Sequence, residues 1–161
     1  MRARGVARAT ALPIATGAVA AAVLACGPSD APPPADGPSE LSAAVLRSAR
    51  YSSQYVDEGE IWMERGIFED TARRVVAVVL PEYAVGDLDG DGTADAAVLI
   101  ATSTGGSGTF QDLAAVLNRG GQPASDATAF LGDRVLVERL SILEGDIQLD
   151  LTMHGPAEPM C

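Results

Sequence analysis

Four aspartates lie close together in the middle of this sequence, at a spacing that suits metal binding. They are Asp87, Asp89, Asp91 and Asp95, at relative positions 1, 3, 5 and 9 of the stretch that begins at Asp87. Ca²⁺ takes about six to eight oxygen ligands and prefers carboxylates and carbonyls. The spacing therefore indicates a loop around a hard cation. The alternative is a solvated acidic turn, because Asp-Gly pairs are common in hairpins.

The way the loop closes separates it from one familiar calcium motif. An EF-hand places a bidentate Glu at position 12, and this sequence has Val98 there. The stretch instead resembles the DxDxDGxxD calcium loop of FG-GAP, integrin-type repeats, over about residues 86–100. That resemblance implies a structural Ca²⁺ with side-chain oxygens from three acids, one backbone carbonyl and a closing acid. In chain order these would be Asp87, Asp89, Asp91, Thr93 and Asp95.

The N-terminal residues have the pattern of an export signal. Three arginines among the first eight residues precede a short apolar run at 9–23, and the sequence Val-Leu-Ala-Cys ends at Cys26. This resembles a bacterial lipobox, which implies that residues 1–25 are a lipoprotein signal peptide and that Cys26 carries the lipid. The alternative is an ordinary secretory signal with an incidental cysteine. The lipobox resemblance places the protein in the bacterial cell envelope, anchored to the outer membrane or to the outer face of the plasma membrane.

A tether and a single domain follow the signal. Residues 26–39 are rich in proline and small residues and have almost nothing to bury, which predicts a disordered tether. We predict that residues 40–161 form one globular domain. The last residue, Cys161, has no partner once Cys26 is lipidated, so we also consider that the chain is a truncated fragment of a larger exported protein.

The charge balance limits the classes of partner. The chain has 11 basic residues and 22 acids, a formal net charge of −11. Removal of residues 1–25 takes away three arginines and no acid, which leaves 8 against 22, or −14. Such a surface repels nucleic acid and attracts divalent cations and basic partners. We therefore expect no nucleic-acid partner, a membrane contact through the lipid, and an unidentified protein or polymer partner in the envelope.

The apolar patterns predict an α+β, strand-rich domain. Apolar residues at helical spacing predict about three turns of helix from Glu40, capped by Ser39 and ending before Tyr51. Strands are expected from the alternating or continuous apolar runs that follow, one of which is stopped by Pro81, with the alternative that residues 83–85 continue it into the aspartate loop. Short Gly-bearing turns between them favour a mostly antiparallel sheet or meander. The predicted strands are residues 60–64, 75–80, 96–102, 109–117, 127–131, 134–142 and 147–151.

No set of residues for catalysis stands out. The single histidine, His154, has no Ser or Cys motif placed to use it, and the chain cannot easily supply a zinc site. A wider stretch, from YAVGDLDGDGTADAAVLI through GGSGTF, LAAVLN and LGDR to HGPAEPMC, resembles an envelope lipoprotein domain sometimes found beside META-type domains, and this implies no activity. We therefore expect a non-enzymatic binding or structural module that calcium stabilises. The alternative is a hydrolase that acts on an envelope polymer.

Overall fold

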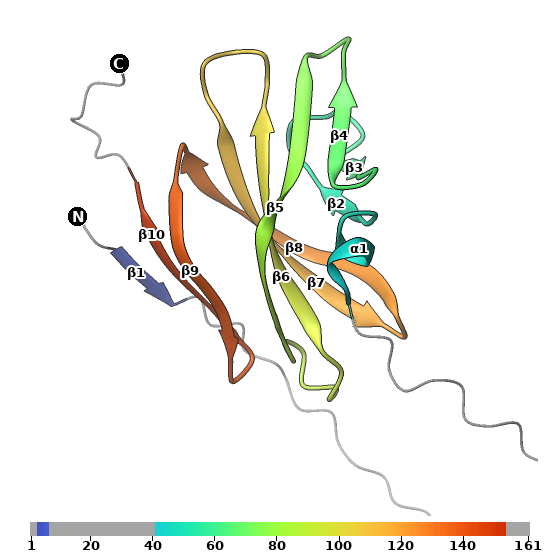
Figure 1. Cartoon of the computed structure of the whole chain (residues 1–161), viewed down its shortest axis with the longest axis vertical. Helices are drawn as coiled ribbons and strands as arrows, with labels where there is room; N and C mark the ends of the chain where they lie inside the picture. Colours follow the sequence, from blue (N-terminus) through green and yellow to red (C-terminus); the bar gives the residue numbers. More distant parts are fainter. Residues whose placement is uncertain (1–2, 7–40, 154–161) are drawn as a thin grey trace, which may run out of the picture.

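The computed structural model of the protein describes residues 3–6 and 41–153 (Figure 1). Predictions that concern Cys26, the tether and Cys161 therefore lie outside the described residues, as does nearly all of the predicted signal peptide. In chain order the elements are β1 (Ala3–Val6), α1 (Ala43–Leu46), β2 (Arg50–Ser52), β3 (Glu60–Trp62), β4 (Ile67–Asp70), β5 (Val75–Gly86), β6 (Asp95–Ser103), β7 (Phe110–Arg119), β8 (Gln122–Asp133), β9 (Leu136–Leu143) and β10 (Asp146–Thr152).

A five-stranded antiparallel sheet forms the centre of the fold. Its strand order is β4-β5-β6-β7-β8, so each strand pairs with its neighbours in the chain, as in a meander. Two smaller antiparallel sheets accompany it, β2-β3 and β1-β10-β9. The prediction of a strand-rich, mostly antiparallel domain with one N-terminal helix is confirmed.

Strand β6 lies in the middle of this sheet and is covered on both faces. Every residue from Asp95 to Ile100 is buried. A strand buried on both sides needs a continuous apolar run rather than alternation, and the run that starts at Ala96 supplies it. The prediction that this strand is buried on both faces is confirmed.

One face of the sheet packs against the helix and the β2-β3 pair. Ala96, Val98 and Ile100 of β6 join a single core cluster with residues from these elements. In Figure 1, α1, β2 and β3 lie together on one side of the five strands. The buried side chains that these elements and the β2-β3 loop contribute are Leu46, Tyr51, Val56 and Ile61.

The hairpin of β9 and β10 lies on the other face. β9 packs against β5 and β6 (Figure 1), and Ala97 and Leu99, which alternate with the core residues of β6, are 0% and 1% exposed. The predicted hairpin of these two strands is confirmed, with its turn at Glu144 and Gly145.

The strand β1 lies within the segment that the sequence predicts to be a signal peptide. It pairs antiparallel with β10, in a register that sets Ala3 opposite Leu151 and Val6 opposite Gln148. This pairing belongs to the full-length chain, and cleavage before Cys26 would remove β1. The signal peptide itself stays a prediction.

The helix is shorter than the sequence predicted. It covers only Ala43–Leu46, and its N-cap is Ser42, whose hydroxyl accepts a hydrogen bond from the Val45 N–H. The predicted three turns are wrong because β2 begins at Arg50 and the chain turns after Leu46 to reach it. Within the described part of the chain, no helix has the length and apolar character needed to cross a membrane.

Proline 81 does not end its strand. β5 continues to Gly86, and its register with β6 shifts between Val79 and Tyr83. Proline has no N–H to donate, but the unpaired residue of a bulge makes no ladder hydrogen bond, so proline is tolerated there. The sequence also underestimated β8, which covers Gln122–Asp133 rather than 127–131, and it did not predict β2 or β4.

Candidate metal centre

The aspartate loop connects the end of β5 to the start of β6. Gly86 and Asp95 face each other as the last residue pair of the two strands. Between them, Gly90 and Gly92 have φ values of +80° and +82°. Residues other than glycine rarely adopt that left-handed backbone conformation. The two glycines therefore allow the loop to fold back within a few residues.

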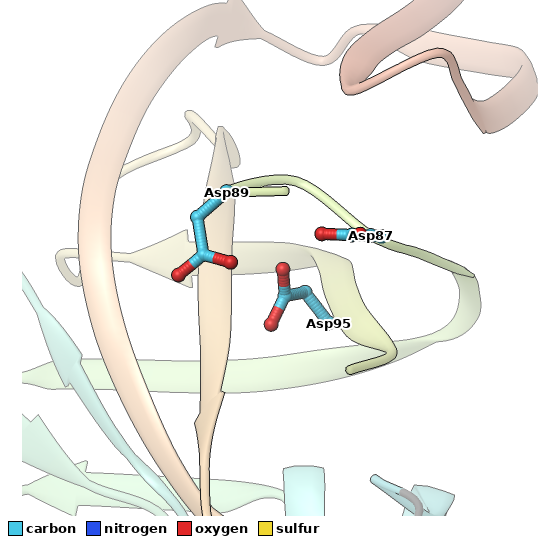
Figure 2. Close-up of side chains that lie close together, drawn as sticks. All are labelled: Asp87, Asp89 and Asp95. Carbon is cyan, nitrogen blue, oxygen red and sulfur yellow. The ribbon is translucent and has the colours of Figure 1, made fainter. Parts of the chain in front are cut away.

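Three carboxylates of the loop converge. Asp87, Asp89 and Asp95 each offer an oxygen, and these oxygens lie within 4.8 Å of one another. Figure 2 shows Asp87 and Asp89 on the loop and Asp95 at the start of β6, with their carboxylates gathered in one region. The sequence predicted that these three acids belong together, and the structure brings them together.

Asp95 is the anchor of the site. It is only 1% exposed, and both of its oxygens accept hydrogen bonds from backbone N–H groups. One oxygen accepts from Leu88 in the loop at 2.8 Å, and the other accepts from Asn118 in β7 at 2.8 Å. A buried carboxylate needs such partners, because an unpaired one costs several kcal/mol. Asp95 therefore ties the loop, β6 and β7 to one point.

The other acids hold the loop in shape through its backbone. The carboxylate of Asp87 accepts hydrogen bonds from Gly90 N–H at 2.7 Å and from Gly92 N–H at 3.0 Å. Asp89 accepts from Asp91 N–H at 3.2 Å. These bonds within the loop keep the carboxylates near one another without a cation.

The remaining two predicted ligands are placed differently. Asp91 does not join the group of three, and its carboxylate accepts a hydrogen bond of 2.7 Å from the Thr93 N–H. Thr93 thus enters the described geometry through its N–H, whereas the resemblance assigned its carbonyl to the metal. Cys26, the predicted lipidation site, lies outside the described residues.

The arrangement fits a hard cation. A carboxylate oxygen has two lone pairs, so an oxygen that accepts one N–H can still bind a metal ion. The three converging carboxylates are the oxygen ligands that Ca²⁺ and Mg²⁺ prefer. Their number leaves further positions for carbonyl oxygens or water, since both ions need more ligands than three carboxylates supply monodentately. The group therefore could hold a metal ion.

Sequence reasoning missed two neighbours of the loop. Asn118 donates through Nδ2 to the Ala94 carbonyl at 3.2 Å and accepts from Gly121 N–H at 2.7 Å, so its side chain also supports the entry to β6. The β9-β10 turn is the second, because a Cβ on Gly145 would lie 3.8 Å and 3.9 Å from the carbonyl oxygens of Leu88 and Asp87. The Glu-Gly-Asp sequence of that turn predicted a hairpin but carried no signal of its place beside the loop.

Comparisons with known proteins leave the family open. No family model matches this chain, and no match was found among the curated proteins or the solved structures. The resemblances to the FG-GAP loop and to an envelope lipoprotein domain thus stay predictions.

Proposed function

We propose that this protein is a calcium-stabilised, non-enzymatic binding or structural module of the bacterial cell envelope, held to the membrane by a lipid on Cys26. The observation that carries the calcium part is the convergence of Asp87, Asp89 and Asp95 at the entrance to the central strand. The lipid anchor rests on the sequence of the first 26 residues and the tether that follows.

The position of Asp95 supports a structural role for the ion. The carboxylate of Asp95 accepts hydrogen bonds from the loop and from β7. A cation that orders the loop would therefore also stabilise the start of the buried strand β6. Three carboxylates so close together repel one another, and a divalent cation would relieve that repulsion. A ligand that binds only the folded state adds about 2.7 kcal/mol when its free concentration is about 100 times its dissociation constant.

The enzymatic alternative requires an acid with a perturbed pKa in a pocket. A pocket of about 130 Å³ beside α1 is lined by apolar side chains and Arg47, with no acid among them. Burial raises the pKa of the Asp112 carboxyl, which lies elsewhere, on β7. This pocket therefore gives no support to a hydrolase, and we favour the non-enzymatic role.

Thermal unfolding of the full-length protein in Ca²⁺ and in EDTA tests the calcium assignment. We expect Ca²⁺ to raise the midpoint, and we expect Asp89→Asn to reduce that rise. Asp126→Asn, which changes an exposed acid on β8, is the matched control and should keep the full rise. An unchanged midpoint in Ca²⁺, or equal shifts in Asp89→Asn and the parent, would overturn the metal site.

The lipid anchor has a separate test. Labelled fatty acid should be incorporated into the protein expressed in a bacterium, and the protein should fractionate with membranes. Cys26→Ala should abolish both. Incorporation that persists in this variant, or a parent protein found free of membranes and unlabelled, would contradict the anchor.

A further inference from the structure

A second carboxylate of the sheet lacks the partners that Asp95 has. Asp112, on β7, is 7% exposed. Among the described residues no hydrogen bond or ion pair reaches its carboxylate, and burial alone accounts for its raised pKa. Buried charges in proteins are paired or bind metals, because an isolated one is costly. A cation that binds from solvent would supply the partner that the described chain does not.

A hydroxyl near Asp112 is unpaired as well. Thr102 of β6 is 1% exposed, and its Oγ1 has no hydrogen-bond partner among the described residues. In the ladder of β6 and β7, Thr102 pairs with Phe110 and Ile100 pairs with Asp112. Paired residues of antiparallel strands share a face, and every second residue of a strand does too. Thr102 and Asp112 thus face the same side of the sheet at neighbouring positions.

Three aromatic rings cluster on this side of the sheet. Phe110 stacks on Tyr55 of the β2-β3 loop, with ring centroids 5.6 Å apart and an interplanar angle of 15°. On its other side Phe110 meets Phe130 of β8, at 6.3 Å and 49°. Phe130 is the residue directly opposite Asp112 in the β7-β8 ladder. The negative charge of Asp112 also raises the pKa of the Tyr55 hydroxyl, after the larger effect of burial, which places the two groups close together.

The site is open to solvent on the side of Phe130. That ring is 55% exposed, although it borders a buried carboxylate. The face of an aromatic ring carries a negative potential, so it attracts a cation and offers nothing to an anion. The net charge of −11 raises the local concentration of cations further.

We propose that Asp112 and the rings of Tyr55, Phe110 and Phe130 form a binding site for an organic cation, an alkylammonium or guanidinium group. The carboxylate supplies the counter-charge, and the rings supply cation–π contact. This proposal rests on the proposed function as a binding module, and it uses none of the metal-loop residues. A free amine and a Lys or Arg side chain of a partner protein present the same chemistry.

An NMR titration of the full-length protein tests the site. The probes are tetramethylammonium chloride, as the free cation, and the tripeptides Gly-Lys-Gly and Gly-Arg-Gly, as the side-chain form, with NaCl at equal ionic strength as the blank. We expect saturable shifts of the Tyr55, Phe110 and Phe130 ring protons. Saturation by tetramethylammonium alone indicates a free amine, and tighter binding of a tripeptide indicates a partner side chain. Shifts that match the NaCl blank for every probe would overturn the site.

Three variants separate the charge from the rings. Asp112→Asn keeps the shape of the side chain and should weaken binding at least tenfold. Phe130→Leu changes an exposed ring, so folding should survive, and it should weaken binding several-fold. Asp126→Asn removes an exposed charge on β8 and should bind as the parent does. Equal affinity in the parent and in Asp112→Asn would overturn the role of the carboxylate, and with it the proposal.

The same titration, repeated in Ca²⁺ and in EDTA, keeps this proposal distinct from the calcium assignment. If the probes bind saturably but Ca²⁺ does not change the unfolding midpoint, the Asp112 site is supported and the metal site is overturned. A protein stabilised by Ca²⁺ that binds none of the probes would do the reverse.

Discussion

The carboxylate of Asp95, the first residue of β6, accepts a 2.8 Å hydrogen bond from the backbone N–H of Asn118 near the end of β7. The two residues are 23 positions apart in the chain, and both are buried. Because the second oxygen of Asp95 holds Leu88, the acidic loop is coupled to the sheet through one side chain. A site built in this way affects folding as well as metal affinity.

Asp95→Asn should destabilise the protein even without metal. Asparagine has one carbonyl oxygen, so one of the two N–H groups of Leu88 and Asn118 would face an NH₂ donor. A buried donor without an acceptor costs about 1–3 kcal/mol. Chemical denaturation in EDTA measures this loss. Asp91→Asn is the control, because its partner Thr93 N–H is served by an exposed side chain, and its effect should stay within about 0.5 kcal/mol. Equal losses in the two variants would contradict the anchoring role of Asp95.

Metal affinity should depend more on Asp89 than on Asp91. The carboxylate of Asp89 belongs to the converging group, and that of Asp91 does not. Calorimetric titration of Ca²⁺ into Asp89→Asn and Asp91→Asn compares them directly. We expect the larger loss of affinity in Asp89→Asn. A larger loss in Asp91→Asn would show that the cation draws Asp91 away from Thr93 and into the site, as the resemblance to the FG-GAP loop implies.

The pH dependence of stability should report Asp112. Burial raises its pKa above the ordinary value of 3.8 in the folded state. The folded protein therefore binds a proton at a higher pH than the unfolded chain does, so this group destabilises the fold above its native pKa and the penalty fades as the pH falls through that pKa. Tyr55, its titratable neighbour, also has a raised pKa and stays protonated in this range.

Asp112→Asn removes that penalty. At neutral pH in EDTA, without organic cations, we expect it to be more stable than the parent by more than the roughly 0.5 kcal/mol typical of neutral surface changes. The difference should shrink as the pH falls toward and below the native pKa of Asp112. Denaturation curves for both proteins from pH 3.5 to 7 measure it, at about half-unit steps. A difference that stays constant over this range would mean that Asp112 does not titrate as an isolated buried acid.

Local patterns predicted the parts of the fold that depend on local chemistry. The apolar run after Asp95 predicted a strand covered on both faces, and the alternation of Ile147, Leu149 and Leu151 predicted a hairpin strand. The spacing of the aspartates likewise predicted that acids of the loop converge, because a glycine-bearing loop brings together residues that are close in sequence. Three of the four acids do meet.

The remainder depends on contacts between distant segments. Pro81 ends a strand in isolation, but the register shift in the β5-β6 ladder removes the need for its N–H. The helix stops at Leu46, where the chain turns into β2, and the buried Tyr51 hydroxyl donates a 2.7 Å hydrogen bond to the Leu46 carbonyl that the helix leaves unpaired. The hydrogen bond from the Asn118 N–H to Asp95 also connects two strands, and no sequence pattern within either strand predicts it.

Gly86→Ala tests whether the β9-β10 hairpin supports the loop. A Cβ on Gly86 would lie 2.6 Å from Cγ2 of Ile142, which is closer than real side chains approach. Ile142 lies on β9, so the added methyl would push the hairpin away from the end of β5 where the aspartate loop begins. Such overpacking typically costs about 1–3 kcal/mol.

Gly106→Ala is the matched control, because nothing lies within 4 Å of a Cβ there. Denaturation in EDTA should show the loss only in Gly86→Ala. Calcium affinity should fall in the same variant, since Gly145 of the β9-β10 turn lies near the carbonyl oxygens of Asp87 and Leu88. Unchanged stability and affinity in Gly86→Ala would mean that the hairpin does not support the loop.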